Sequence, residues 1–179
     1  MEVTEALARK KQEILSLWIE RTLDSCGAPG FFKTARDPFA NPVGSNTTSG
    51  LTALFDLLLA GAEMHAFDKP LDQVVRLRAV QDLTPAQAVA PFLELKWVIK
   101  QVFSGDQGLQ PLLSRLDDLD CQIDRVALAA FNIYSDCREQ LYRNRIRELK
   151  SGSSIFTDAA CPSALMRRAQ QGASAELET

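Results

Sequence analysis

The feature that most constrains this chain is a stretch of 40 residues, from Leu112 to Ser151, that contains neither proline nor glycine. Apolar residues recur in its first part at alternating steps of four and three, at Leu112, Leu116, Leu119, Ile123, Val126, Ala130, Ile133 and Cys137. This heptad pattern predicts one long α-helix with an apolar seam. Such a helix measures about 60 Å, whereas a globule of 150 residues has a radius of gyration of about 15 Å. We therefore expect one end of the helix to leave the globule or to pack on a partner.

The heptad seam also predicts how the chain associates. A sustained apolar seam on a helix this long is typical of a surface that a second helix covers. We therefore expect a homodimer whose seam consists of Leu116, Leu119, Ile123, Val126, Ile133 and Cys137. Beyond Cys137 the apolar residues drift to other positions, and the surface becomes strongly charged.

Helical spacing of apolar residues predicts four further helices, and no segment shows the alternation of a strand. The first covers residues 4–24, and the second begins at 48 and ends between 61 and 65. A shorter third helix begins at 69–70, and the fourth covers residues 84–103. Thr84 and Gln87 match a capping box around Pro85, while Pro91 is expected to kink the same helix near its start. The fold class is therefore all-α.

Two segments are expected to be irregular. Residues 31–47 carry prolines and a glycine but also Phe31, Phe32 and Phe39, which favours a loop packed against the body. Residues 151–179 are rich in Ser, Ala, Gly and Gln, which is typical of a flexible tail. We therefore expect one helical domain over residues 1–150, followed by a C-terminal tail over 151–179.

Composition excludes several classes of function. The formal net charge is −3, which argues against a protein that binds nucleic acid through bulk charge. No run approaches the roughly 18 apolar residues of a membrane span, and the polar N-terminus lacks the apolar core of a secretory signal. We therefore expect a cytoplasmic protein without membrane insertion, in which Cys26, Cys121, Cys137 and Cys161 stay reduced.

The sequence carries few signs of catalytic chemistry. The sequence contains no glycine-rich phosphate loop, no HExxH motif and no GxSxG motif. His65 is the only histidine, so every mechanism that needs an imidazole depends on it. A helix-terminal histidine facing solvent is the simpler interpretation, and an axial haem ligand is the alternative. We predict no enzyme activity, no catalytic residues, no metal site and no cofactor.

Three separated stretches resemble one known family. They are DPFANPVG at residues 37–44, RLRAVQDLTPAQAV at 76–89, and FNIYSDCREQLY at 131–142 with RELK at 147–150. Together they resemble the RsbRD N-terminal domain, the sensory half of bacterial RsbT co-antagonist proteins. The resemblance extends over about residues 5–150 in the same order, without a large gap.

The resemblance implies properties that the spacing alone does not show. Related stressosome sensor modules have a globin-like helical fold without haem, form dimers, and join through a long last helix to a C-terminal STAS domain. Here 29 residues follow Lys150, which are too few for that domain. We therefore expect a standalone sensory or regulatory module that acts through protein–protein contacts in bacterial stress signalling. The alternatives are an accessory protein of an anaerobic redox complex, of the sulfate-reduction type, and a globin-like protein that binds haem or another small ligand.

Five polar residues within or next to the family stretches are candidates for a ligand or partner surface. They are Asp37, Asn41, Arg76, Arg78 and Asp82. Each also has a structural interpretation. Asp37 and Asn41 can bond turn backbone, Asp82 can cap the helix near Thr84, and Arg78 can pair with a carboxylate.

Overall fold

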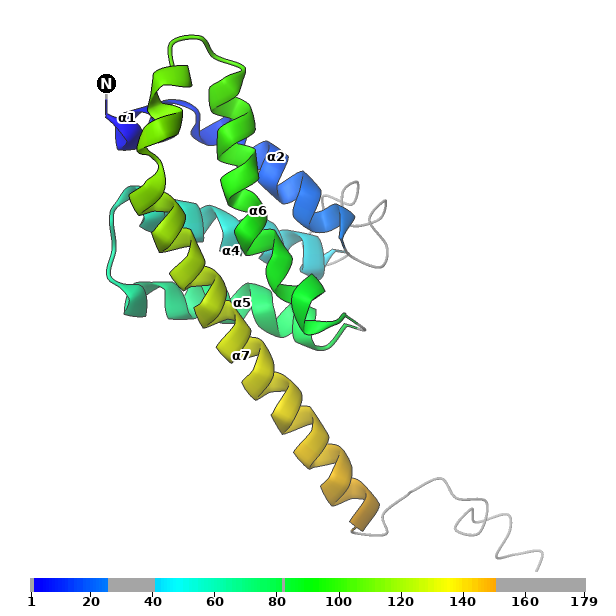
Figure 1. The fold of residues 1–179 in the computed structure, drawn as a ribbon. Coiled ribbons are helices and arrows are strands. Elements are labelled where there is room, and N and C mark those ends of the chain that lie inside the picture. Colours follow the sequence, from blue (N-terminus) through cyan, green and yellow to red (C-terminus); the bar gives the residue numbers. More distant parts are fainter. Residues whose placement is uncertain (1, 26–40, 82, 151–179) are drawn as a thin grey trace, which may run out of the picture. The chain divides into compact units, whose positions relative to one another are not determined.

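The computed structural model describes residues 2–25, 41–81 and 83–150 (Figure 1). The chain divides into two compact units, residues 1–138 and residues 139–179. The predicted domain boundary after residue 150 falls inside the second unit and remains a prediction. The predicted tail, the aromatic residues of the 31–47 loop, Asp37 and Asp82 lie outside the described residues.

The described residues form helices and no strand, which confirms the predicted all-α class. The globin-like arrangement remains a prediction. The elements are α1 (Val3–Arg9), α2 (Lys11–Asp24), α4 (Pro42–Leu59), the 3₁₀ helix η1 (Met64–Phe67), α5 (Asp68–Ala79), α6 (Pro85–Ser104), the 3₁₀ helix η2 (Gln110–Arg115) and α7 (Asp117–Lys150).

Three helix boundaries differ from the predicted ones. The first predicted helix is two helices that meet at Lys10. The next begins at Pro42 rather than near residue 48, because the Asn41 side chain accepts a hydrogen bond from the Gly44 N–H at 2.8 Å and Pro42 suits the first helical position. The long helix is preceded by a separate 3₁₀ turn, and the two meet at Leu116.

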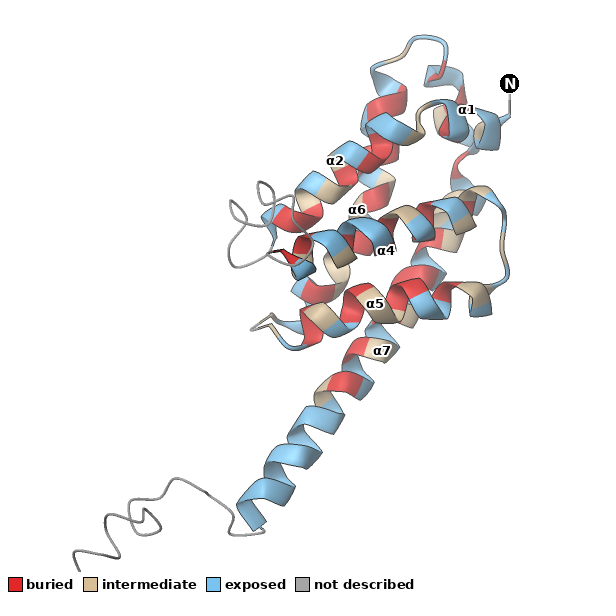
Figure 2. Ribbon diagram, turned by 180° about the vertical axis from the view of Figure 1, so that it is seen from behind, coloured by how far each residue is buried: buried red, intermediate tan, exposed pale blue. Residues whose placement is uncertain are grey.

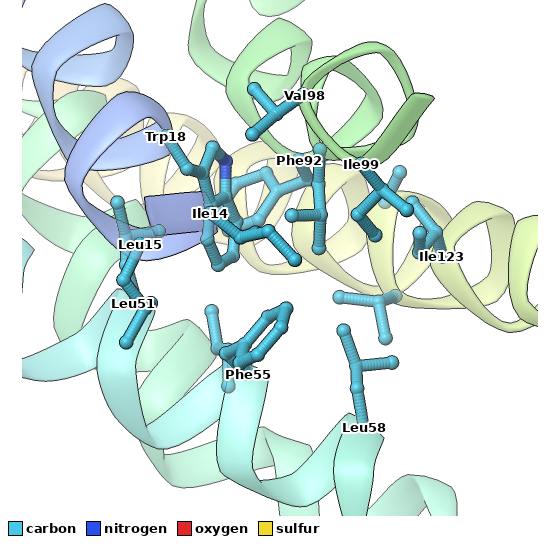
Figure 3. Packing of buried hydrophobic residues seen from close by; sticks show 14 of the residues in the cluster. Ile14, Leu15, Trp18, Leu51, Phe55, Leu58, Phe92, Val98, Ile99 and Ile123 are labelled. Carbon is cyan, nitrogen blue, oxygen red and sulfur yellow. The ribbon is translucent and has the colours of Figure 1, made fainter. Parts of the chain in front are cut away.

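The core of the first unit lies between α2, α4, α5, α6 and the first part of α7 (Figures 2 and 3). Trp18 of α2, Phe55 of α4 and Phe92 of α6 are its largest fully buried apolar side chains in the close view. Gly50 lets α4 and α5 approach closely, since a Cβ at this position would clash with Cγ2 of Val74. This packing positions α6 and α7, whose outer faces carry the site described below.

The residues predicted as a dimer seam belong to this same core. Leu116, Ile123, Val126 and Cys137 are buried within the single chain, and the half-buried Leu119 and Ile133 pack against the core. This burial corrects the expectation that the heptad face is a free surface for a second copy. The heptad instead marks the side of α7 that the chain's own α-helices cover.

Candidate protein-docking groove

An apolar groove runs between α6 and α7 within the first unit. It encloses about 770 Å³. Its lining residues are Pro85, Ala86, Val89, Ala90 and Leu93 of α6 with Asp124, Ala127, Leu128 and Phe131 of α7. Asp124 is the one lining residue with a charged side chain. A groove of this composition is suited to apolar side chains of a partner rather than to a charged ligand.

Large and small side chains have different places in this groove. Leu93, Leu128 and Phe131 keep 44%, 66% and 45% of their surface exposed. Ala127 is buried and Ala90 is half-buried, so these two small residues lie deeper than the large ones. The groove therefore offers both projecting apolar side chains and space to receive them.

Charged pairs connect the two helices at one end of the groove. Lys96 of α6 forms an ion pair with Asp124 of α7 at 2.6 Å, and Lys100 pairs with Asp120 at 2.8 Å. In both pairs the cation belongs to α6 and the carboxylate to α7. The charges at this end of the groove therefore balance, with the positive charges on α6 and the negative charges on α7.

An exposed aromatic residue continues the outer face of α6. Trp97 is 45% exposed, and the Arg21 guanidinium lies over its ring at 4.3 Å from the centroid. Arg21 also pairs with Glu94 at 3.1 Å. These contacts hold an amphipathic ring in place at the surface, as is common in protein interfaces.

A capping box and one buried arginine stabilise the start of α6. Thr84 and Gln87 form the predicted capping box. Pro91 cannot donate to the carbonyl of Gln87, four residues earlier. The Arg78 Nη2 donates to that carbonyl at 2.9 Å, and its Nε donates to the Ala88 carbonyl at 3.0 Å. Arg78 thus replaces the hydrogen bond that the proline removes, and α6 continues through Pro91 as one helix.

This arrangement corrects the prediction for Arg78. Its side chain is only 2% exposed, so it is not part of a surface for ligands or partners. Asn41 is also buried, and its side chain caps α4. Arg76 is exposed and pairs with Asp72 at 2.6 Å, an interaction that raises the pKa of the guanidinium. The structure therefore does not gather these three candidate residues into one site.

The residues considered for haem and metal chemistry are also separate from the groove. His65 is exposed on η1 and lines neither hollow described for this unit. Cys121 is exposed, while burial raises the pKa of the Cys137 thiol. Cys26 and Cys161 lie outside the described residues. Within the described ranges, no cluster of three metal-binding side chains occurs and no helix has the length and hydropathy to cross a membrane.

A second hollow of about 720 Å³ lies between α1, the end of α4 and the start of α7, and it is polar. Arg115 pairs there with Glu2 at 2.9 Å, and Asp117 and Asp118 add two further carboxylates. Its one guanidinium is therefore already neutralised by a carboxylate. This hollow contrasts with the apolar groove and offers no comparable surface for a protein partner.

Leu93, Leu128 and Phe131 are not among the site residues predicted from the sequence. A signal was present, because Leu128 and Phe131 stand three residues apart and off the heptad seam. Two large apolar residues away from the buried face of an amphipathic helix indicate a second contact surface.

The match to a family model decides the classification of this chain. The model of the RsbT co-antagonist protein rsbRD N-terminal domain matches residues 12–149. The chain belongs to this family. No curated protein and no solved structure matches the chain. The RsbRD N-terminal domain family is a regulatory signalling family, and this agrees with the resemblance found in the three sequence stretches.

Proposed function

We propose that this RsbRD N-terminal domain protein is a non-catalytic, cytoplasmic sensory module of bacterial stress signalling that acts through protein–protein contacts. The observation that carries the proposal is the apolar groove between α6 and α7, combined with membership of a signalling family. The occupant that we propose for the groove is a second copy of this chain. The homodimer expected from the sequence is thus retained, but with a different interface.

Self-complementarity supports a second copy as the occupant. The groove contains both projecting side chains, such as Leu128 and Phe131, and the small residues that could receive them. A two-fold axis that runs along the groove, parallel to its two helices, places α6 of one copy against α7 of the other. Lys96 and Lys100 of each copy then face Asp120 and Asp124 of its partner, so the charges attract rather than repel.

The test is the solution mass of the full chain, measured by light scattering with a paired variant. The wild-type chain should have twice the monomer mass of 19.8 kDa. The double variant Leu128→Asp with Phe131→Asp should fall to the monomer mass while keeping its helical circular dichroism, because both side chains are exposed in the single chain.

The matched control is Ile146→Asp with Leu149→Asp, which changes two exposed apolar residues of the second unit. This control should remain a dimer. A wild-type monomer would contradict the homodimer, and loss of the dimer in the control alone would place the interface outside the groove.

A further inference from the structure

A second exposed apolar surface lies on the described part of the second unit, residues 139–150. Tyr142, Ile146 and Leu149 are 59%, 51% and 67% exposed. Their steps of four and three place them in one stripe of an α-helix, within an arc of about 60° at roughly 100° per residue. An arc this narrow is typical of a helix–helix seam. Leu141, which is 42% exposed, lies about 100° from Tyr142 on the far side of Arg145 and is not part of this stripe.

The stripe is bordered mainly by cations. At the same rotation per residue, Arg145 lies along one edge, and Lys150, Arg143 and one acidic residue, Glu139, lie along the other. Arg143 pairs with Glu139 at 2.6 Å, and Arg145 pairs with Glu148 at 3.4 Å. Residues 139–150 contain four basic and two acidic side chains, so they retain a net charge of +2 within a chain of net charge −3.

The charges that border the stripe determine which kind of helix can pack against it. In helix pairs, residues next to the apolar seam meet the corresponding residues of the other helix. A second copy of residues 139–150 would bring Arg143, Arg145 and Lys150 against cations in either orientation, and such contacts are unfavourable. Carboxylates at the corresponding positions would instead form ion pairs across the seam.

We propose that residues 139–150 bind an acidic amphipathic helix of another protein, with Tyr142, Ile146 and Leu149 in the seam. This surface is distinct from the α6–α7 groove, and the partner is a different protein rather than a second copy. The chain would then have one surface for self-association and another for a signalling partner. The inference does not depend on the groove, because its test measures peptide binding rather than dimer mass.

The test uses the full chain and two synthetic helical peptides of four heptads each. Both peptides carry isoleucine and leucine in the seam; one has glutamate at the bordering positions and the other has lysine. Fluorescence anisotropy of the labelled peptides should show that the acidic peptide binds roughly tenfold more tightly than the basic one. Added salt should weaken this binding, since the border charges are exposed.

Two variants separate the seam from its border. Ile146→Asp should abolish binding of the acidic peptide, because it places a charge in the seam. The triple variant Arg143→Glu, Arg145→Glu, Lys150→Glu should reverse the preference toward the basic peptide. All three border residues are exposed and lie outside the core of the first unit, so the melting temperature of that core should stay close to the wild-type value. The triple variant loses the Arg143–Glu139 and Arg145–Glu148 ion pairs, so its helical circular dichroism is compared with that of the wild type to show that residues 139–150 remain helical.

Several results would overturn the proposal. Equal binding of the two peptides, or no binding of the acidic one, would show that the border charges do not select a carboxylate-rich helix. Binding to vesicles of phosphatidylserine and phosphatidylcholine without binding to the acidic peptide would assign the stripe to a lipid surface. Loss of the dimer in Ile146→Asp would assign it to a second copy.

Discussion

The helix α7 has apolar side chains in two regions that are used differently. Within residues 117–138, Ile123, Val126 and Ala130 are buried in the core of the first unit. Within residues 139–150, Tyr142, Ile146 and Leu149 are exposed and bordered mainly by cations. Figure 2 shows the last turns of α7 as exposed. Both regions show steps of three and four residues. Helical periodicity therefore shows which side chains share a face, but not whether the chain itself covers that face.

The largest expected effect tests this difference with the same substitution in both regions. Ile123→Ala should lower the free energy of unfolding by about 2–5 kcal/mol, because it removes a buried side chain and leaves a cavity. Ile146→Ala should change it by no more than about 0.5 kcal/mol, because Ile146 is half exposed. Urea denaturation followed by circular dichroism measures both values.

Equal losses of stability in these two variants would contradict the difference in burial between the two regions of α7. They would mean that Ile146 is packed in the folded protein as Ile123 is. A small loss for both would mean that the core around Ile123 tolerates a cavity or collapses around it, as some cores do.

A smaller effect is expected at Arg78, which supports the start of α6 and therefore one wall of the groove. Arg78→Met should cost about 1–3 kcal/mol, because it removes the donor to the buried Ala88 carbonyl and to the part-buried Gln87 carbonyl. Pro91→Ala supplies a backbone N–H four residues after Gln87 and should recover part of that loss in the double variant. A double-mutant cycle in urea measures the coupling.

Additive effects of the Arg78 and Pro91 substitutions would contradict the proposed replacement of one hydrogen bond by another. The control is Arg76→Met, an exposed arginine on the same helix whose ion pair with Asp72 is solvent-accessible. Its cost should be no more than about 1 kcal/mol, and it should not couple to Pro91→Ala.

Much of the fold could be predicted from local signals. The capping box at Thr84 and Gln87 and the long helix around Ile123 depend on neighbouring residues and on periodicity, so the sequence shows them directly. The break at Lys10 could not be predicted, because Leu7 and Ile14 fit one continuous apolar stripe. The start of α4 at Pro42 was hidden by the neighbouring proline and glycine residues, although Asn41 before Pro42 is a good cap.

The candidate site was less predictable, for a physical reason. Arg78 was identified as important, but its hydrogen bonds join α5 to the first turns of α6, and this contact between two helices has no signature within either segment. The groove depends on Leu93 and Phe131 coming together from two helices. Their exposure is a property of the packed unit rather than of either segment.

The smallest expected effect is a pH dependence at Asp106, whose contacts lie at the surface of the first unit. The Gly108 N–H donates to Oδ1 at 3.0 Å, and Lys10 lies 3.3 Å from Oδ2. The Gly108 hydrogen bond and the Lys10 charge lower the pKa of Asp106 below its usual value of 3.8. A lowered pKa in the folded state means that the carboxylate contributes stability above the usual pKa and loses it as pH falls through the folded value.

Asp106→Asn should therefore lower Tm slightly at pH 7, by less than Arg78→Met does, and the difference from wild type should close as the pH falls below about 3.8. Thermal melts of both proteins between pH 7 and pH 3 measure this difference. If the difference in Tm between wild type and variant instead grew as the pH fell, the pKa of Asp106 would be raised in the folded state rather than lowered. The native fold would then favour the protonated carboxyl group. A difference that stays constant would show that the introduced amide disturbs the Gly108 turn itself, independently of charge.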